Sequence, residues 1–90
     1  MNEQEEKIYE IVVKTLRNDG KVKGEITPES RLREDLGLDS LDYLAVVTGL
    51  EENVKRAYRI KNFEISDSVA LEIKTVKDIV DYILKNVIKK

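Results

Sequence analysis

The spacing of apolar residues constrains the fold of this chain more than any other feature of its sequence. In three segments, apolar side chains recur every three or four positions, which places them along one face of a helix. We therefore predict helices over residues 2–18, 40–58 and 76–88. The apolar stripes consist of Ile8, Ile11, Val12 and Leu16 in the first segment, of Leu41, Leu44, Val47, Leu50, Val54 and Tyr58 in the second, and of Val76, Ile79, Val80, Ile83, Leu84 and Val87 in the last.

A fourth, shorter helix is predicted between the second and the last. It covers residues 66–72, with Ser66 or Asp67 as its cap. The last helix starts with Thr75 followed three residues later by Asp78, a variant of the capping box. No segment shows a convincing strand pattern, since the weak alternation over residues 58–65 has no second strand to pair with.

Residues 19–39 form a loop that is longer than the usual connection between helices. It starts at Asn18-Asp19-Gly20, where asparagine or glycine is expected to adopt the left-handed conformation that ends a helix. We predict an all-α fold of one small antiparallel four-helix bundle, with three longer helices, a short third helix and this long loop between the first and second helices. The apolar residues expected to anchor the loop are Ile26, Leu32, Leu36 and Leu38.

Length and composition exclude several classes of function. The 90 residues suffice for one domain, residues 1–90, with a single modest core, so an enzyme with its own substrate cleft would have little room. Cysteine and histidine are absent, which removes disulfides, the usual zinc ligands, the commonest general base and the thiol nucleophile. We therefore expect no enzyme and no metal site, and any thiol chemistry requires an imported thiol.

Charge is distributed unevenly along the chain. Residues 1–52 hold 13 acidic and 7 basic side chains, whereas residues 53–90 hold 5 acidic and 9 basic ones. The acidic half can attract basic patches on partner proteins. The alternative is that both halves are simply solvated faces that keep the protein in solution. A short basic stretch in a net acidic chain does not predict nucleic-acid binding. The acidic start is unlike a secretory signal and the longest apolar run, residues 44–47, is too short to span a bilayer, so we expect a cytoplasmic protein.

The junction between the loop and the second helix concentrates residues suited to one kind of chemistry. Ser40 opens the predicted helix, Asp39 is placed to cap it, and Asp42 adds negative charge to its first turn. Unpaired backbone N–H groups and the positive end of the helix dipole favour a negative group such as a phosphodiester here. Gly37 allows a tight turn before the helix.

The neighbours of Ser40 are expected to direct its hydroxyl outward. Leu38 and Leu41 flank it and can point toward the core, which would leave the hydroxyl in solvent. The spaced carboxylates do not form a calcium loop, because a loop starting at Asp35 has Ser40 instead of glycine at its sixth position and Val46 instead of glutamate at its twelfth. Taken alone, Ser40 is a plain helix-start serine.

The full run Asp35-Leu36-Gly37-Leu38-Asp39-Ser40-Leu41-Asp42 resembles the acyl carrier protein family, whose mark is Asp-Ser-Leu at the start of the second helix. The triplet by itself is weak evidence, whereas the longer pattern is specific. It lies in a chain of carrier length, after a long loop and before Leu50-Glu51-Glu52. Ile73-Lys74-Thr75-Val76 then leads into the last helix, so the resemblance covers nearly the whole chain.

The resemblance implies a monomeric carrier protein with a covalent cofactor. A phosphopantetheinyl transferase, with magnesium, moves 4'-phosphopantetheine from coenzyme A to the serine, here Ser40, and the thiol of the arm holds acyl groups as thioesters in fatty-acid or related lipid or polyketide biosynthesis. Asp39 is implied to help the transferase and its metal engage, and Leu41 completes the attachment motif. Acidic residues of this region are implied to pair with basic patches on acyl-loading and acyl-transfer enzymes; by position they are Asp35, Asp42, Glu51 and Glu52, with Asp39.

The chain departs from the family pattern at two places. Ala45 stands where carriers often have an acidic residue in the middle of the second helix. The stretch 53–63 is longer than usual and basic. One interpretation is a longer second helix with a solvated basic end; the other is a specialised carrier whose basic residues repel standard partners. The basic residues are Lys55, Arg56, Arg59 and Lys61, of which Lys55 and Arg56 are candidates for partner recognition.

The resemblance leaves the carried group open. A fatty-acyl carrier is expected to hold an apolar cleft between the second, third and fourth helices. A carrier of aminoacyl or polyketide units has the same build, although aspartate before the serine is unlike most peptide-synthetase carriers. The alternative from another class is a small helical adaptor with an unmodified serine. The residues expected to line the cleft are Val47, Leu50, Val69 and Val76.

Overall fold

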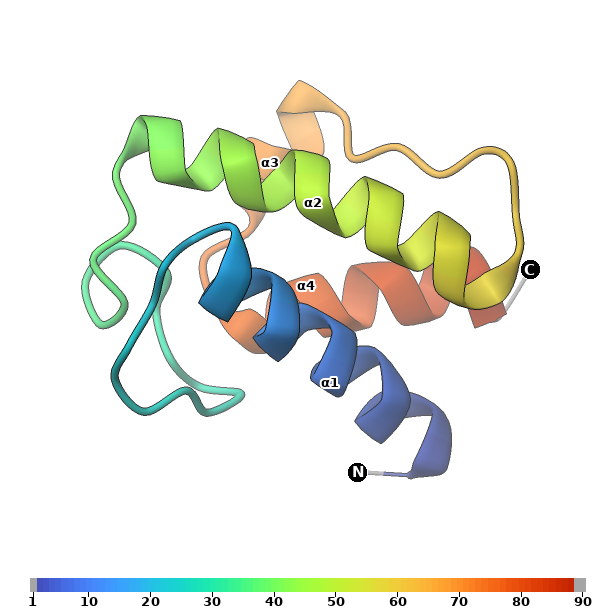
Figure 1. Ribbon diagram of the computed structural model, residues 1–90, viewed down its shortest axis with the longest axis horizontal. Coiled ribbons are helices and arrows are strands. Elements are labelled where there is room, and N and C mark those ends of the chain that lie inside the picture. The colour runs from blue at the N-terminus through green and yellow to red at the C-terminus, as the bar shows by residue number, and fades with distance from the viewer. Residues whose placement is uncertain (1, 89–90) are drawn as a thin grey trace.

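The computed structural model describes residues 2–88 and contains the four predicted helices. They are α1 (Glu3–Asn18), α2 (Ser40–Tyr58), α3 (Asp67–Glu72) and α4 (Val76–Ile83), and α4 continues directly into a π-helical turn, η1 (Leu84–Ile88). Figure 1 shows α1 below α2 and in front of α4, the short α3 behind α2, and the long loop gathered at one end of the bundle. Within residues 2–88 the only β pairing is an isolated bridge, so the all-α prediction is confirmed.

Each helix starts at a side chain that accepts a hydrogen bond from its first turn, as an N-cap requires. The predicted caps are confirmed: Asp39 accepts from the Asp42 amide, Ser66 from the Val69 amide and Thr75 from the Asp78 amide. Both Asp39 and Thr75 form reciprocal capping boxes, and so does Asn2 at the start of α1. The helix boundaries therefore follow from local sequence.

The core lies where α1 packs against α2 and α4. The predicted stripes of α1 and α4 enter it, with Ile11 and Leu84 half-buried at its edge. The stripe predicted for α2 is wrong at its beginning, since Leu41 is 78% exposed and Leu44 is 59% exposed. The core face of α2 instead repeats every four residues and consists of Val46, Leu50 and Val54.

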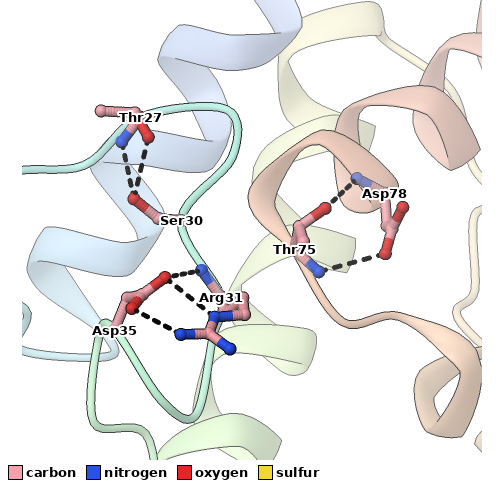
Figure 2. A network of polar contacts seen from close by, with 6 residues as sticks. All are labelled: Thr27, Ser30, Arg31, Asp35, Thr75 and Asp78. Atoms are coloured by element: carbon pink, nitrogen blue, oxygen red, sulfur yellow. Dashed lines mark hydrogen bonds and ion pairs between the residues drawn. The ribbon is translucent and has the colours of Figure 1, made fainter.

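The loop over residues 19–39 is tied to the start of α4 by backbone hydrogen bonds. Figure 2 shows the side-chain bonds within the two segments, which join Thr27 to Ser30 and Arg31 to Asp35 in the loop, and Thr75 to Asp78 at the start of α4. The carbonyl oxygen of Ser30 accepts from the Val76 amide at 3.1 Å and that of Pro28 from the Lys77 amide at 2.8 Å. These two amides belong to the first turn of α4 and have no partner within their own helix. Of the predicted loop anchors, Leu32 and Leu38 are buried, and Ile26 and Leu36 are half-buried.

The turn after α1 differs from the prediction in one respect. The left-handed residue is Lys21, with φ of 57°, and not Asn18 or Gly20. Gly20 is needed for space: a Cβ there would lie 2.8 Å from Val46 Cγ2 and 2.9 Å from the Leu16 carbonyl oxygen. The glycine therefore permits close packing between the end of α1 and α2, while Lys21 makes the turn.

The stretch 53–63 divides between helix and extended chain. α2 ends at Tyr58, Arg59 follows in the left-handed conformation with φ of 54°, and the chain then runs extended toward α3. Phe63 and Ile65 are buried and hold this connection against the bundle. No helix within residues 2–88 is both long and apolar enough to cross a lipid bilayer.

Candidate functional site at the start of α2

A short turn over residues 32–38 leads directly into α2. The amide of Leu38 donates to the Leu32 carbonyl at 3.1 Å, and the amide of Gly37 donates to the Arg33 carbonyl at 3.1 Å. Between these two bonds Gly37 has a φ of 72°, a left-handed conformation that glycine adopts without steric cost. The turn buries Leu32 and Leu38. Gly37 thus permits the tight turn that was predicted before the helix, and the residues after Leu38 lie at the surface.

Ser40 is the first residue of α2 and is exposed. Asp39 caps the helix by accepting from the Asp42 amide at 2.8 Å, and the Asp42 carboxylate in turn accepts from the Asp39 amide at 3.4 Å. The hydroxyl therefore stands at the positive end of a 19-residue helix. That end favours a negatively charged substituent.

The two leucines that flank Ser40 have opposite positions. Leu38 points inward as expected and is 4% exposed, whereas Leu41 points outward and is 78% exposed. The prediction for Leu41 is wrong because Leu38 already fills the core beside Val46: the side chains of both residues border the space that a Cβ on Gly20 would occupy. Ser40 and Leu41 thus form one exposed surface.

A pocket of about 530 Å³ opens beside Ser40, between the loop, the first turn of α2, and α3 with the residues that follow it. A volume of this order is typical of small-molecule sites. The prediction for its lining is wrong, since Val47, Leu50, Val69 and Val76 do not border it. Leu50 and Val76 are fully buried in the core behind it. The pocket is lined by Leu32, Arg33, Glu34, Ser40, Tyr43, Leu44, Asp67, Ala70, Leu71, Ile73 and Lys74.

Tyr43 crosses the inner side of this pocket. Its hydroxyl donates to the Ala70 carbonyl oxygen at 2.7 Å, which joins α2 to α3. Burial raises the pKa of Tyr43 above its usual value, and the positive charge of Arg33 opposes part of that rise. The phenol is therefore protonated at neutral pH, as its donor role requires.

The acidic residues predicted to recognise partners take part in bonds within the chain. Asp35 accepts from the Arg31 amide at 2.8 Å and also from its guanidinium; these hydrogen bonds lower the pKa of the Asp35 carboxyl. Glu51 accepts from the Ile65 amide at 2.9 Å. Asp35, Asp39 and Asp42 therefore belong to the segment that leads into α2 and opens it. Glu51 lies farther along α2, about 16 Å from Ser40 at ~1.5 Å per residue.

The remaining recognition candidates lie on the last turns of α2. Glu52 pairs with Lys55 at 3.1 Å, and the Arg56 guanidinium donates to the Asn53 side-chain oxygen at 3.2 Å. Ala45, Arg56, Arg59 and Lys61 are exposed. The structure thus separates the predicted residues into a group around Ser40 and a second, mixed-charge group at the far end of the helix.

Sequence reasoning missed the residues that shape the pocket. Tyr43 and Leu44 follow Ser40 by three and four positions, so they share its helix face. That spacing could have placed them beside Ser40. Arg33, Leu71 and Lys74 also line the pocket, but they lie in other segments of the chain. No spacing in the sequence relates them to Ser40.

Comparisons with known proteins agree with one another. A family model described as a phosphopantetheine attachment site matches residues 6–83. The acyl carrier protein of Syntrophobacter fumaroxidans is 44% identical over 80 residues, which cover 89% of this chain and 86% of that protein. Those of Helicobacter hepaticus and Phytoplasma australiense are 43% and 44% identical over 81 residues, in each case 90% of this chain and 93% of the relative.

Proposed function

The chain belongs to the acyl carrier protein family, and from that premise we propose that Ser40 is the residue to which its 4'-phosphopantetheine arm is attached. The protein is a carrier of acyl groups, which the thiol of the covalent arm holds as thioesters. Members of the family are carriers rather than catalysts, and we propose that this chain likewise has no catalytic activity of its own. We propose that residues 1–90 act as one domain, supported by a single core that runs from Ile8 to Ile83.

The observation that carries the assignment of Ser40 is its position. It is exposed, it opens α2, and it borders the pocket, so an arm on its hydroxyl begins in solvent with an apolar recess beside it. The phosphodiester of the arm fits the positive end of α2. The carboxylate of Asp39 keeps that helix end intact by binding the Asp42 amide.

The neighbours of Ser40 offer a surface for the enzyme that attaches the arm. Asp39 and Asp42 provide negative charge, and the 78% exposed side chain of Leu41 provides an apolar contact. Apolar groups that are surrounded by charge are typical of the centre and rim of protein interfaces. We assign these three residues to recognition by the phosphopantetheinyl transferase.

The family implies acyl-handling enzymes as further partners, and we propose that they too approach the Ser40 end of a monomeric, cytoplasmic carrier. Asp35 supports this surface through its bond to Arg31, which keeps the loop in place. The farther group of Glu51, Glu52, Lys55 and Arg56 is proposed to select among partners. Support for selection comes from the exposed basic end of α2 and from Ala45, which leaves the middle of the helix uncharged.

The proposal is tested by loading the arm. The protein is incubated with coenzyme A, magnesium and a broad-specificity phosphopantetheinyl transferase, and intact mass is measured. We expect the mass to rise by one phosphopantetheine, and we expect no rise for Ser40→Ala. Ser66→Ala serves as the matched control, because Ser66 also lies exposed at a helix start but outside the motif.

The folded state of each variant is checked by circular dichroism. Loading of Ser40→Ala would disprove the assignment of Ser40. A folded, arm-free native protein that accepts no arm would leave the unmodified adaptor as the better description.

A further inference from the structure

The pocket beside Ser40 ends within about one turn of α2, and we propose that Tyr43 sets this limit and so determines which acyl groups the carrier can enclose. The inference rests on the proposed attachment at Ser40. It adds a residue that selects among acyl groups by size, through contacts that Tyr43 makes within the chain.

The first argument comes from the face of α2 that borders the pocket. Ser40, Tyr43 and Leu44 lie on that face and line the pocket, whereas Val47, the next residue on the same face, does not. The pocket therefore stops between the first and second turns of α2. Tyr43 lies between Ser40 and Val47 on this face, and its aromatic ring is the largest side chain that α2 contributes to the pocket.

The second argument comes from the bond across the pocket. The Ala70 carbonyl lies near the end of the six-residue α3, where the following turn would normally supply its donor. The Lys74 amide, which would be that donor in a longer helix, instead donates to the Asp78 carboxylate at 2.9 Å. The Tyr43 hydroxyl takes its place and fixes the distance between α2 and α3.

The third argument concerns what lies beyond Tyr43. Leu50, farther along α2, and Val76, at the start of α4, are fully buried, whereas α3 buries none of its residues. Space for a longer chain can therefore come only from the volume that the Tyr43 ring occupies, and the bond to the Ala70 carbonyl holds the ring in that place. A short acyl group fits the existing pocket. A long one must extend back toward the mouth, where Leu71 is 76% exposed.

The test measures how well the pocket protects the thioester. Native protein is loaded at Ser40 with a series of acyl-phosphopantetheine arms from acetyl to palmitoyl, loading is verified by intact mass, and thioester cleavage by hydroxylamine is timed. Each methylene that becomes buried should slow cleavage about fourfold. We expect the protection to rise along the series and then level off once the pocket is full.

Two variants separate the ring from the hydroxyl. Tyr43→Val removes the barrier, and the protection should level off only at longer chains. Tyr43→Phe keeps the ring and loses the bond, so the protection should level off at the same chain but be weaker by about two- to tenfold. Tyr9→Val and Tyr9→Phe are matched controls, because Tyr9 is also half-buried and donates to a backbone carbonyl, that of Ile26, but lies outside the pocket.

The outcomes are distinguishable. Failure to load the native protein overturns the proposed attachment and this inference with it. Normal loading with the same levelling point in native protein and in Tyr43→Val overturns the inference alone. If Tyr43→Val does not fold, the acyl series on the native protein still tests the inference. Thioester protection that keeps rising up to palmitoyl would rule out a barrier at Tyr43.

Discussion

Gly20 shows how a single residue connects two parts of this bundle. The sequence marks it as a helix terminator, which is correct for its place in the chain and wrong for its conformation, because Lys21 adopts the left-handed backbone. Gly20 has to be small because the side chains of Val46 and Leu38 fill the space beside it. Both of these residues are distant from Gly20 in the sequence. Contacts of this kind could not be predicted from a local pattern. The exposure of Leu41 has the same origin.

We expect Gly20→Ala to lower the free energy of unfolding by about 1–3 kcal/mol, because the added methyl group collides with Val46 and with the Leu16 carbonyl. Denaturant unfolding followed by circular dichroism measures the change. Gly24→Ala is the control: no atom lies within 4 Å of the new methyl group, so a gain of about 0.4–1 kcal/mol is expected. Equal effects at both positions would contradict the packing role of Gly20.

At the scale of helices, local sequence predicted the bounds and caps closely, because periodicity and capping depend on neighbouring residues. The pairing between helices depends on buried polar contacts that sequence does not reveal. Thr15, fully buried on α1, donates to the Ile11 carbonyl and accepts from the Asn53 side chain of α2 at 2.8 Å. This bond sets how α1 and α2 are aligned.

Replacing Thr15 by valine keeps its shape and removes the acceptor for the Asn53 amide. We expect Thr15→Val to lower the free energy of unfolding by about 1–3 kcal/mol, since a partly buried donor loses its partner. The double variant Thr15→Val with Asn53→Leu should recover most of the loss. If the double variant instead loses more unfolding free energy than the two single variants together, the bond between Thr15 and Asn53 is not what joins the helices.

At the scale of the whole molecule, the position of Ser40 at a helix start was easier to predict than the pocket. The proposed attachment motif is contiguous in sequence, and its helix-start placement follows from Asp39 and Gly37. The pocket combines three segments, so its lining depended on the three-dimensional arrangement. The unequal charge of residues 1–52 and 53–90 is a property of the whole chain, and the structure places the basic residues at and just after the end of α2 in solvent, at Arg56, Arg59 and Lys61.

This exposed basic end leads to a prediction about exchange between partners. We expect the loaded protein to react poorly with acyl-transfer enzymes that serve a standard fatty-acid carrier, because like charges repel their basic patches. Neutralising Lys55, Arg56, Arg59 and Lys61 to glutamine should raise the rate at low salt by about tenfold or more, and less at high salt.

Four other lysines provide the control for that experiment. Glutamine at the exposed Lys14, Lys21, Lys23 and Lys77 removes the same charge from α1, the loop and the start of α4 and should have a smaller effect. Normal reaction of the unchanged protein with the standard enzymes would rule out selection by the basic end.

The carbonyl oxygens of Pro28 and Ser30 bind the loop to α4, so the loop and the start of α4 are expected to unfold together. They complete the first turn of α4, although they precede it by more than forty residues. The amides of Val76 and Lys77 are therefore shielded from hydrogen exchange only while the loop is docked. Since the same loop leads through Gly37 into Ser40, the proposed attachment site and the start of α4 belong to one cooperative unit, and any opening that releases one also releases the other.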